Sequence, residues 1–199
     1  MRTRTAAAFS LAAVLALGAC SSGPSKSTAT KSSAAPTPTA DKPAAELAFG
    51  KPAETVGSGG TGRLEVTPTS IVYVTKALID KPSKGLFAVV TVKDRATTAV
   101  AAEETAPIMQ GGWQWIAPDG QAIATGDGTA DMVSIEGFKS GGAVQPGAFR
   151  WESRVFDISE KQRGGTLVYT DGAGKSFRWK TPAQDAGPQV EELKKALAE

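Results

Sequence analysis

From Leu47 to Thr181, apolar residues come in short groups that often alternate with polar residues, and Gly, Pro and Asp separate the groups. Alternation with a period of two places every second side chain on one face of an extended chain, which is typical of a strand buried on one side. Helical periodicity is almost absent from this stretch. Roughly 135 residues are enough to enclose one hydrophobic core. The pattern therefore predicts an all-β domain, in which about seven short strands form an immunoglobulin-like antiparallel β-sandwich.

The clearest strand signal lies in the middle of this stretch. Residues 86–92 are apolar on both faces, which indicates a central strand. Residues 113–116 precede Asp119-Gly120, a pair that suits a tight turn, so we expect a hairpin there. The other expected strands are 63–67, 70–75, 149–156, 166–170 and 175–180.

The only helical pattern lies at the C-terminal end. After Gly187-Pro188, the residues Val190, Leu193 and Leu197 fall at helical spacing within 189–199. A helix of this length is not stable alone in water. We therefore expect it either to pack on the domain or to fray.

The N-terminal residues have the features of a secretion signal. Arg2 and Arg4 precede an apolar run, 6–17, which is well short of the about 20 residues that cross a membrane as a helix. The following Leu17-Gly18-Ala19-Cys20 resembles the bacterial lipobox, whose cysteine receives a diacylglyceryl group. An ordinary cleavable signal with an incidental cysteine is the alternative. We expect a mature protein that begins at Cys20 and is held by lipid on the extracytoplasmic face of the bacterial cell membrane.

The segment after Cys20 has a different composition from the rest of the chain. Residues 21–45 consist almost wholly of Ser, Thr, Ala, Pro, Lys and Gly. Such a segment buries too little apolar surface to offset the entropy lost on ordering, so we expect a disordered stalk, with or without glycans. The expected organisation is a signal peptide at 1–19, a lipidated stalk at 20–45, a β-sandwich at 46–182 and a tail with a short amphipathic helix at 183–199.

The residue counts exclude several classes of function. The signal carries two of the 22 Lys and Arg residues, so 20 basic residues face 20 acidic ones in the mature chain. No run of basic residues supplies the positive surface that binds nucleic acid, and we expect no nucleic-acid partner. The chain has no histidine and only one cysteine, which rules out a Ser-His-Asp triad and an internal disulfide. No cofactor is expected.

Acidic residues gather between 119 and 136, where Gly126 to Asp131 loosely resembles a calcium loop. The spacing does not match that of an EF-hand, so the alternatives are weak calcium binding through Asp127 and Asp131 or a solvated Asp-Gly turn. Elsewhere, Glu103-Glu104 and Glu152 offer carboxylates of the kind that hydrolyse glycosides when they flank a sugar. Such pairs occur in many chains, and we expect that the protein is not an enzyme.

Two tryptophans share one face of an expected strand. Trp113 and Trp115 lie two residues apart, directly after Gly111-Gly112. Aromatic faces stack on sugar rings and prolines and anchor interfaces. The alternatives for this pair are an exposed binding patch and burial in the sandwich core.

The order of these elements resembles a group of bacterial surface lipoproteins with an immunoglobulin-like, telokin-like β-sandwich. The resemblance rests on the lipobox and stalk, on Phe49-Gly50, on strands at 62–67 and 86–92, on the hairpin at 113–120 and on a late strand at 147–156. The chain departs from the group after the central strand, where an asparagine is usual and this chain has Asp94-Arg95. The resemblance implies the fold and the extracytoplasmic location.

The function class follows from the tether and from what the chain lacks. A lipid-anchored sandwich without catalytic residues is expected to be a non-catalytic surface interaction or adhesion module that binds a protein or cell-wall partner. The alternative is a carrier of a small ligand or of calcium, which would need a pocket.

Overall fold

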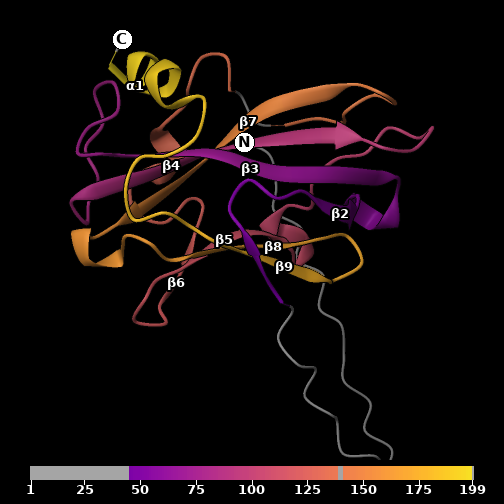
Figure 1. Ribbon diagram of the computed structural model, residues 1–199, viewed down its shortest axis with the longest axis horizontal. Helices are drawn as coiled ribbons and strands as arrows, with labels where there is room; N and C mark the ends of the chain where they lie inside the picture. The colour runs from indigo at the N-terminus through magenta and orange to yellow at the C-terminus, as the bar shows by residue number, and fades with distance from the viewer. Residues whose placement is uncertain (1–44, 139–140, 199) are drawn as a thin grey trace, which may run out of the picture. The chain divides into compact units, whose positions relative to one another are not determined.

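The computed structural model describes residues 45–138 and 141–198, which form two β-sheets packed face to face (Figure 1). One sheet has the strand order β2-β3-β4-β7, and the other has the order β1-β9-β8-β5-β6. The strands are β1 (Glu46–Ala48), β2 (Ala53–Val56), β3 (Arg63–Val74), β4 (Leu86–Ala96), β5 (Gly112–Ile116), β6 (Ala122–Ala124), β7 (Phe149–Ile158), β8 (Thr166–Thr170) and β9 (Ser176–Lys180). All pairs are antiparallel except β1 with β9. The predicted all-β sandwich is confirmed.

Short 3₁₀ helices and one α-helix complete the described part of the chain. The 3₁₀ helices are η1 (Ser58–Gly60), η2 (Pro107–Met109), η3 (Ala130–Met132) and η4 (Glu160–Gln162), and the α-helix is α1 (Val190–Ala198).

The long strand β4 lies at the centre of its sheet, between β3 and β7. Val90 and Val92 belong to the core between the two sheets, whereas Phe87 and Val89 belong to a second apolar cluster on the opposite face. Because both faces of β4 are covered, the strand is apolar at nearly every position from 86 to 92.

The second apolar cluster receives the C-terminal helix. Figure 1 shows α1 on the side of β3 and β4 that faces away from β5, β8 and β9. Leu193 and Leu197 are buried there, in the cluster that contains Val72 and Phe87. An ion pair between Lys194 and Asp185, with 2.9 Å between Nζ and Oδ2, adds a polar contact. Of the two alternatives for this helix, the structure shows docking.

Both tryptophans of β5 lie in the core between the sheets. Trp113 is 3% exposed and Trp115 is fully buried. The rings of Trp115 and Phe156, from opposite sheets, have centroids 5.8 Å apart, and those of Trp113 and Trp179 are 5.7 Å apart. The prediction of an exposed patch formed by Trp113 and Trp115 is therefore wrong, because the pleat turns both side chains toward the facing sheet.

The signal, Cys20 and the stalk as far as residue 44 lie outside the described residues. Within the ranges 45–138 and 141–198, no helix combines the length and the apolar composition needed to cross a membrane.

Candidate functional site

Two neighbouring strands bring charged side chains into the space between the sheets. Along β7, Arg150, Glu152 and Arg154 occupy every second position, so the pleat places all three on one face. Glu152 pairs with Val92 of β4, which lies in the interlayer core, and Arg150 pairs with Asp94. The space between the sheets therefore holds a charged group beside the apolar core residue Val92.

Glu104 reaches the same place from the segment between β4 and β5. The next residue fixes this segment, because the Thr105 N–H donates a hydrogen bond to the Tyr169 hydroxyl at 2.9 Å. Gly112, with φ +85°, then allows β5 to begin in contact with the segment, since a Cβ there would lie 3.0 Å from the Thr105 carbonyl oxygen. Glu104 is thus positioned by β8 and by the start of β5.

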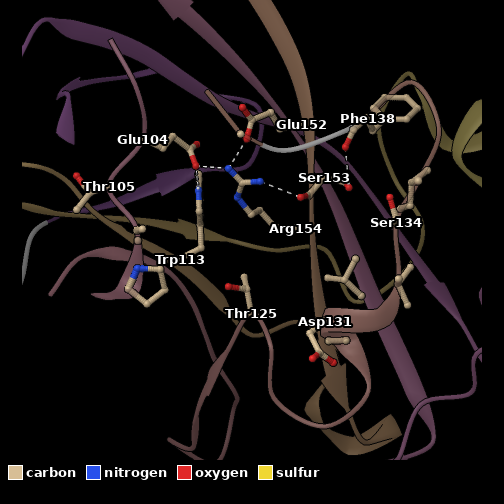
Figure 2. Close-up of a pocket in the computed structure, with 18 of the residues that line it drawn as sticks. Glu104, Thr105, Trp113, Thr125, Asp131, Ser134, Phe138, Glu152, Ser153 and Arg154 are labelled. Carbon is tan, nitrogen blue, oxygen red and sulfur yellow. Dashed lines mark hydrogen bonds and ion pairs between the residues drawn. The ribbon is translucent and has the colours of Figure 1, made fainter. Parts of the chain in front are cut away.

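Arg154 lies between Glu104 and Glu152 (Figure 2). Its Nη2 donates to Oε2 of Glu152 at 2.5 Å and also to Oε2 of Glu104. The same Glu104 oxygen accepts a hydrogen bond from the Trp113 indole N–H at 2.6 Å. Burial opposes the charge of Arg154, but the two carboxylates outweigh burial and raise its pKa above the ordinary value. The guanidinium therefore remains charged between the sheets.

A second arginine contacts Glu152 from the other side. Arg150 forms an ion pair with Oε1 of Glu152 and donates to the carbonyl oxygens of Gly141 and Gly142 at 2.5 and 2.7 Å. Glu152 is 1% exposed. Each of its carboxylate oxygens faces a guanidinium, and this compensates for the loss of water.

Asp94 differs from its neighbours because no guanidinium of the described residues forms an ion pair with it. Its side chain is fully buried, and neither oxygen accepts a hydrogen bond from the described part of the chain. Burial raises the pKa of Asp94 well above its usual range, Glu104 and Glu152 raise it further, and Arg154 opposes them.

Three carboxylates meet at this point, and we call Asp94, Glu104 and Glu152 the acidic cluster. One carboxylate oxygen of each residue lies within 4.8 Å of those of the other two. Within the described ranges, two arginines, Arg150 and Arg154, form ion pairs with the cluster. The cluster therefore has one carboxylate more than its guanidinium partners.

A pocket of about 590 Å³ leads from the surface to the acidic cluster. Glu104, Glu152 and Arg154 form its charged wall. Its apolar wall consists of Trp113, Pro107, Val133, Ile135, Phe138 and Val155. Asp131 and Ser134 also line the pocket and are exposed, so the pocket is open to solvent (Figure 2). Such a mixed lining is typical of a binding site.

The structure does not bring the two proposed calcium ligands into one site. Asp127 is exposed, and its Oδ2 accepts a hydrogen bond from the Ala124 N–H at 3.0 Å, as in a solvated turn. Asp131 lies in η3 at the pocket. Among the described residues, the acidic cluster is the one group of three carboxylates close enough to hold an ion. Of the two alternatives for this loop, the contacts of Asp127 support the solvated turn.

The structure brings some of the site residues proposed from the sequence into the pocket, together with residues that were not proposed. Glu104 and Glu152, considered above as a carboxylate pair, do meet, although Arg154 lies between them. Trp113 contributes its indole N–H to the site instead of an exposed face. Asp94 and Arg150 also belong to the site, and neither was among the candidates from the sequence.

Comparison with known proteins identifies proteins of similar fold but does not assign the chain to a family. No family model and no curated protein matches the chain. The structure is similar to that of MPT63, a secreted protein from Mycobacterium tuberculosis, with a TM-score of 0.50 and 15% identity over 71% of this chain and 100% of that chain. At this identity the similarity shows a shared fold.

Two further solved structures are more distant. A candidate lipoprotein from Bacillus subtilis, YcdA, has a TM-score of 0.43 and 12% identity over 75% of this chain and 42% of that chain. A conserved hypothetical protein from Bacillus anthracis has a TM-score of 0.42 and 16% identity over 66% of this chain and 93% of that chain.

Proposed function

We propose that the protein is a non-catalytic, lipid-anchored binding protein of the extracytoplasmic surface, which accepts part of a protein or cell-wall partner in the pocket. The signal and the lipobox at Cys20 support the location. The description of MPT63 as a secreted protein agrees with it.

The pocket is the observation that carries this proposal. It combines a charged wall, formed by Glu104, Glu152 and Arg154, with an apolar wall. A ligand that carries both polar and apolar groups can satisfy both walls at once.

Exposed apolar side chains on the two 3₁₀ helices at the pocket support a macromolecular partner. Ile108 of η2 is 89% exposed and Met132 of η3 is 62% exposed. Their neighbours Pro107 and Asp131 line the pocket. Apolar side chains exposed at the mouth of a pocket favour contact with a partner that also fills it.

The arrangement of the carboxylates supports binding over hydrolysis. Glycoside hydrolases leave the space between their two carboxylates to the sugar and to water. Here the Arg154 guanidinium occupies that space and bonds to both Glu104 and Glu152. With no histidine in the chain, we infer that the pocket binds and does not catalyse.

The test compares photocrosslinking to a partner with the pocket open and with the pocket blocked by a bulky side chain. A photoreactive side chain replaces Met132 in the full chain, which is irradiated in intact cells. We expect one covalent adduct, and we expect Ser134→Trp, which places an indole in the pocket, to remove it. Ala99→Trp, at an exposed position away from the pocket lining, is the matched control and should keep the adduct. No adduct in either background, or an equal adduct in both, would overturn the proposal.

The anchor is tested separately. We expect Cys20→Ser to release the protein into the medium or to block removal of the signal, because the thiol that receives the lipid is gone. Fractionation of cells and gel mobility measure both effects. A variant that stays in the membrane with unchanged mobility would contradict lipid attachment at Cys20.

A further inference from the structure

The acidic cluster contains acceptors that the described part of the chain leaves unused. Both oxygens of Asp94 and Oε1 of Glu104 are buried and accept no hydrogen bond there. A buried ionised carboxylate without a donor is costly, so natural proteins pair such groups, keep them protonated or use them to coordinate a metal. The unused oxygens lie in the same cluster, beside oxygens that Arg154 already contacts.

We propose that Asp94, Glu104 and Glu152 form an interior site for one calcium ion that enters through the pocket. The inference rests on the same pocket as the proposed function, but it does not depend on the identity of the partner. Glu104 and Glu152 line the pocket and also belong to the cluster, so they connect the ion with solvent.

The burial of Asp94 supports calcium over magnesium, and the separation of the oxygens is compatible with calcium. Ca²⁺ binds oxygen at 2.3–2.6 Å, so two of its ligands can lie about 5 Å apart, whereas Mg²⁺ at 2.0–2.1 Å holds its ligands within about 4.2 Å. One oxygen from each carboxylate lies within 4.8 Å of the others, which one Ca²⁺ ion can span throughout that range. Mg²⁺ also keeps several of its waters, and Asp94 is fully buried.

The arginines do not contact every carboxylate oxygen of the acidic cluster, so some oxygens remain for the ion. Arg154 uses Oε2 of Glu104, which leaves Oε1 for a ligand, and Asp94 keeps both oxygens. Glu152 contacts a guanidinium at each oxygen and would share one of its oxygens between an arginine and the ion. Among the described residues, three carboxylates contact two guanidiniums, so a cation would compensate the negative charge that remains when all three carboxylates are ionised.

The experiment measures calcium binding by the full chain in detergent after treatment with EGTA. Titration calorimetry with CaCl₂ should give one site, and about 10 mM CaCl₂ should raise the melting temperature by about 3–10 °C if the Kd lies in the range of extracellular calcium modules. MgCl₂ at the same concentration should have less than a third of this effect. Tb³⁺, a calcium substitute, should luminesce when the Trp113 indole is excited, since that indole contacts Glu104.

Two variants locate the site. Asp94→Asn keeps the shape of the side chain, and it should abolish both the heat and the shift in melting temperature. The double variant Asp127→Asn/Asp131→Asn removes the loop carboxylates and should bind calcium as the wild type does. No calcium effect on the wild type, an equal effect on Asp94→Asn, or an equal response to magnesium would overturn the proposal.

The same proteins separate this inference from the proposed function. If the Met132 adduct forms and Ser134→Trp removes it while calcium has no effect, only the calcium site is rejected. If calcium binds at Asp94 but no adduct forms, the partner is rejected and the ion site stands.

Discussion

Asp94 and Asp157 are both fully buried, on neighbouring strands of one sheet, yet their surroundings are opposite. Asp157 accepts hydrogen bonds from the backbone of Ser83 at 2.7 Å, Lys84 at 2.8 Å and Thr129 at 3.1 Å, and from two hydroxyls. Asp94 accepts none from the described residues. Burial alone would raise the pKa of Asp157, but these donors outweigh it and lower that pKa. The pKa of Asp94 is raised.

The difference shows that burial of a carboxylate does not define its role. Asp157 lies on the outer face of β7 and joins the loop before β4 to the start of η3, so its charge is used entirely by the fold. Asp94 lies on the inner face of β4, where the fold supplies two more carboxylates instead of donors. Carboxylate oxygens that accept no hydrogen bond from the fold are available to a ligand.

The largest expected effect comes from removing the guanidinium of Arg154. Arg154→Met would leave Glu104 and Glu152 without this partner, as Asp94 already is, and we expect a loss of about 4 kcal/mol in the free energy of unfolding. Urea denaturation followed by tryptophan fluorescence measures it. Arg178→Met, a partly exposed arginine of β9, is the control and should cost less than about 0.5 kcal/mol. A loss below about 1 kcal/mol for Arg154→Met would show that the cluster does not need its guanidinium.

The next effect concerns the aspartate that the fold does use. Asp157→Ala removes the buried acceptor of several charge-assisted hydrogen bonds, including those from the backbone of Ser83, Lys84 and Thr129, so we expect a loss of about 3 kcal/mol in unfolding free energy. Asp119→Ala, which removes an exposed turn acceptor for the Gln121 N–H, should cost less than about 1 kcal/mol in the same assay. If the two variants lose the same stability, the hydrogen bonds of Asp157 contribute little.

The sequence was sufficient for the strands and for the sandwich, because alternation with a period of two is a local property. It was not sufficient to predict which face of each strand points into the core. In β7, Phe149 and Trp151 alternate with Arg150 and Glu152, and hydrophobicity alone would turn the aromatic face inward. The structure does the reverse, because the face that carries the charges continues into Phe156, a residue of the interlayer core.

Asp94 had a signal that could have identified it. It is in phase with Val90 and Val92, so the same alternation that predicts a buried face predicts a buried carboxylate. The chain also departs at this residue from the group of surface lipoproteins that it resembles, in which an asparagine is usual after the central strand. The meeting of Asp94 with Glu104 could not be predicted, because it depends on how the segment before β5 packs against Tyr169.

The pH dependence of stability should separate the two aspartates by sign. The lowered pKa of Asp157 means that its carboxylate stabilises the fold above the unfolded pKa of about 3.9, and this contribution is lost as the pH falls through the lower folded pKa. We expect Asp157→Asn to reduce the loss of stability below about pH 4. Urea midpoints from pH 2.5 to 8 in EGTA measure the curve. An unchanged acid limb would contradict the lowered pKa.

Asp94 should contribute with the opposite slope in the same series. With a raised pKa, the folded state keeps a proton that the unfolded chain releases above about pH 3.9, so stability falls as the pH rises through the folded pKa. Glu104, Glu152, Arg150, Arg154 and Tyr169 are the charged or titratable groups around it. Without calcium, Asp94→Asn should flatten this part of the curve. A variant curve parallel to that of the wild type would show that Asp94 does not hold the proton.

The smallest expected effect is the most informative about the comparison. At pH 7 in EGTA, Asp94→Asn should leave the free energy of unfolding unchanged or raise it by up to about 1 kcal/mol, because it removes a buried carboxyl group whose oxygens have no donor and adds an amide that can donate to Glu104. In about 10 mM CaCl₂ the order should reverse, since only the wild type gains the binding energy of the ion. Urea denaturation of both proteins in both buffers gives the four values. A variant that loses more than about 1 kcal/mol in EGTA would show that the fold uses the Asp94 carboxylate as it uses that of Asp157, and the contrast between the two residues would disappear.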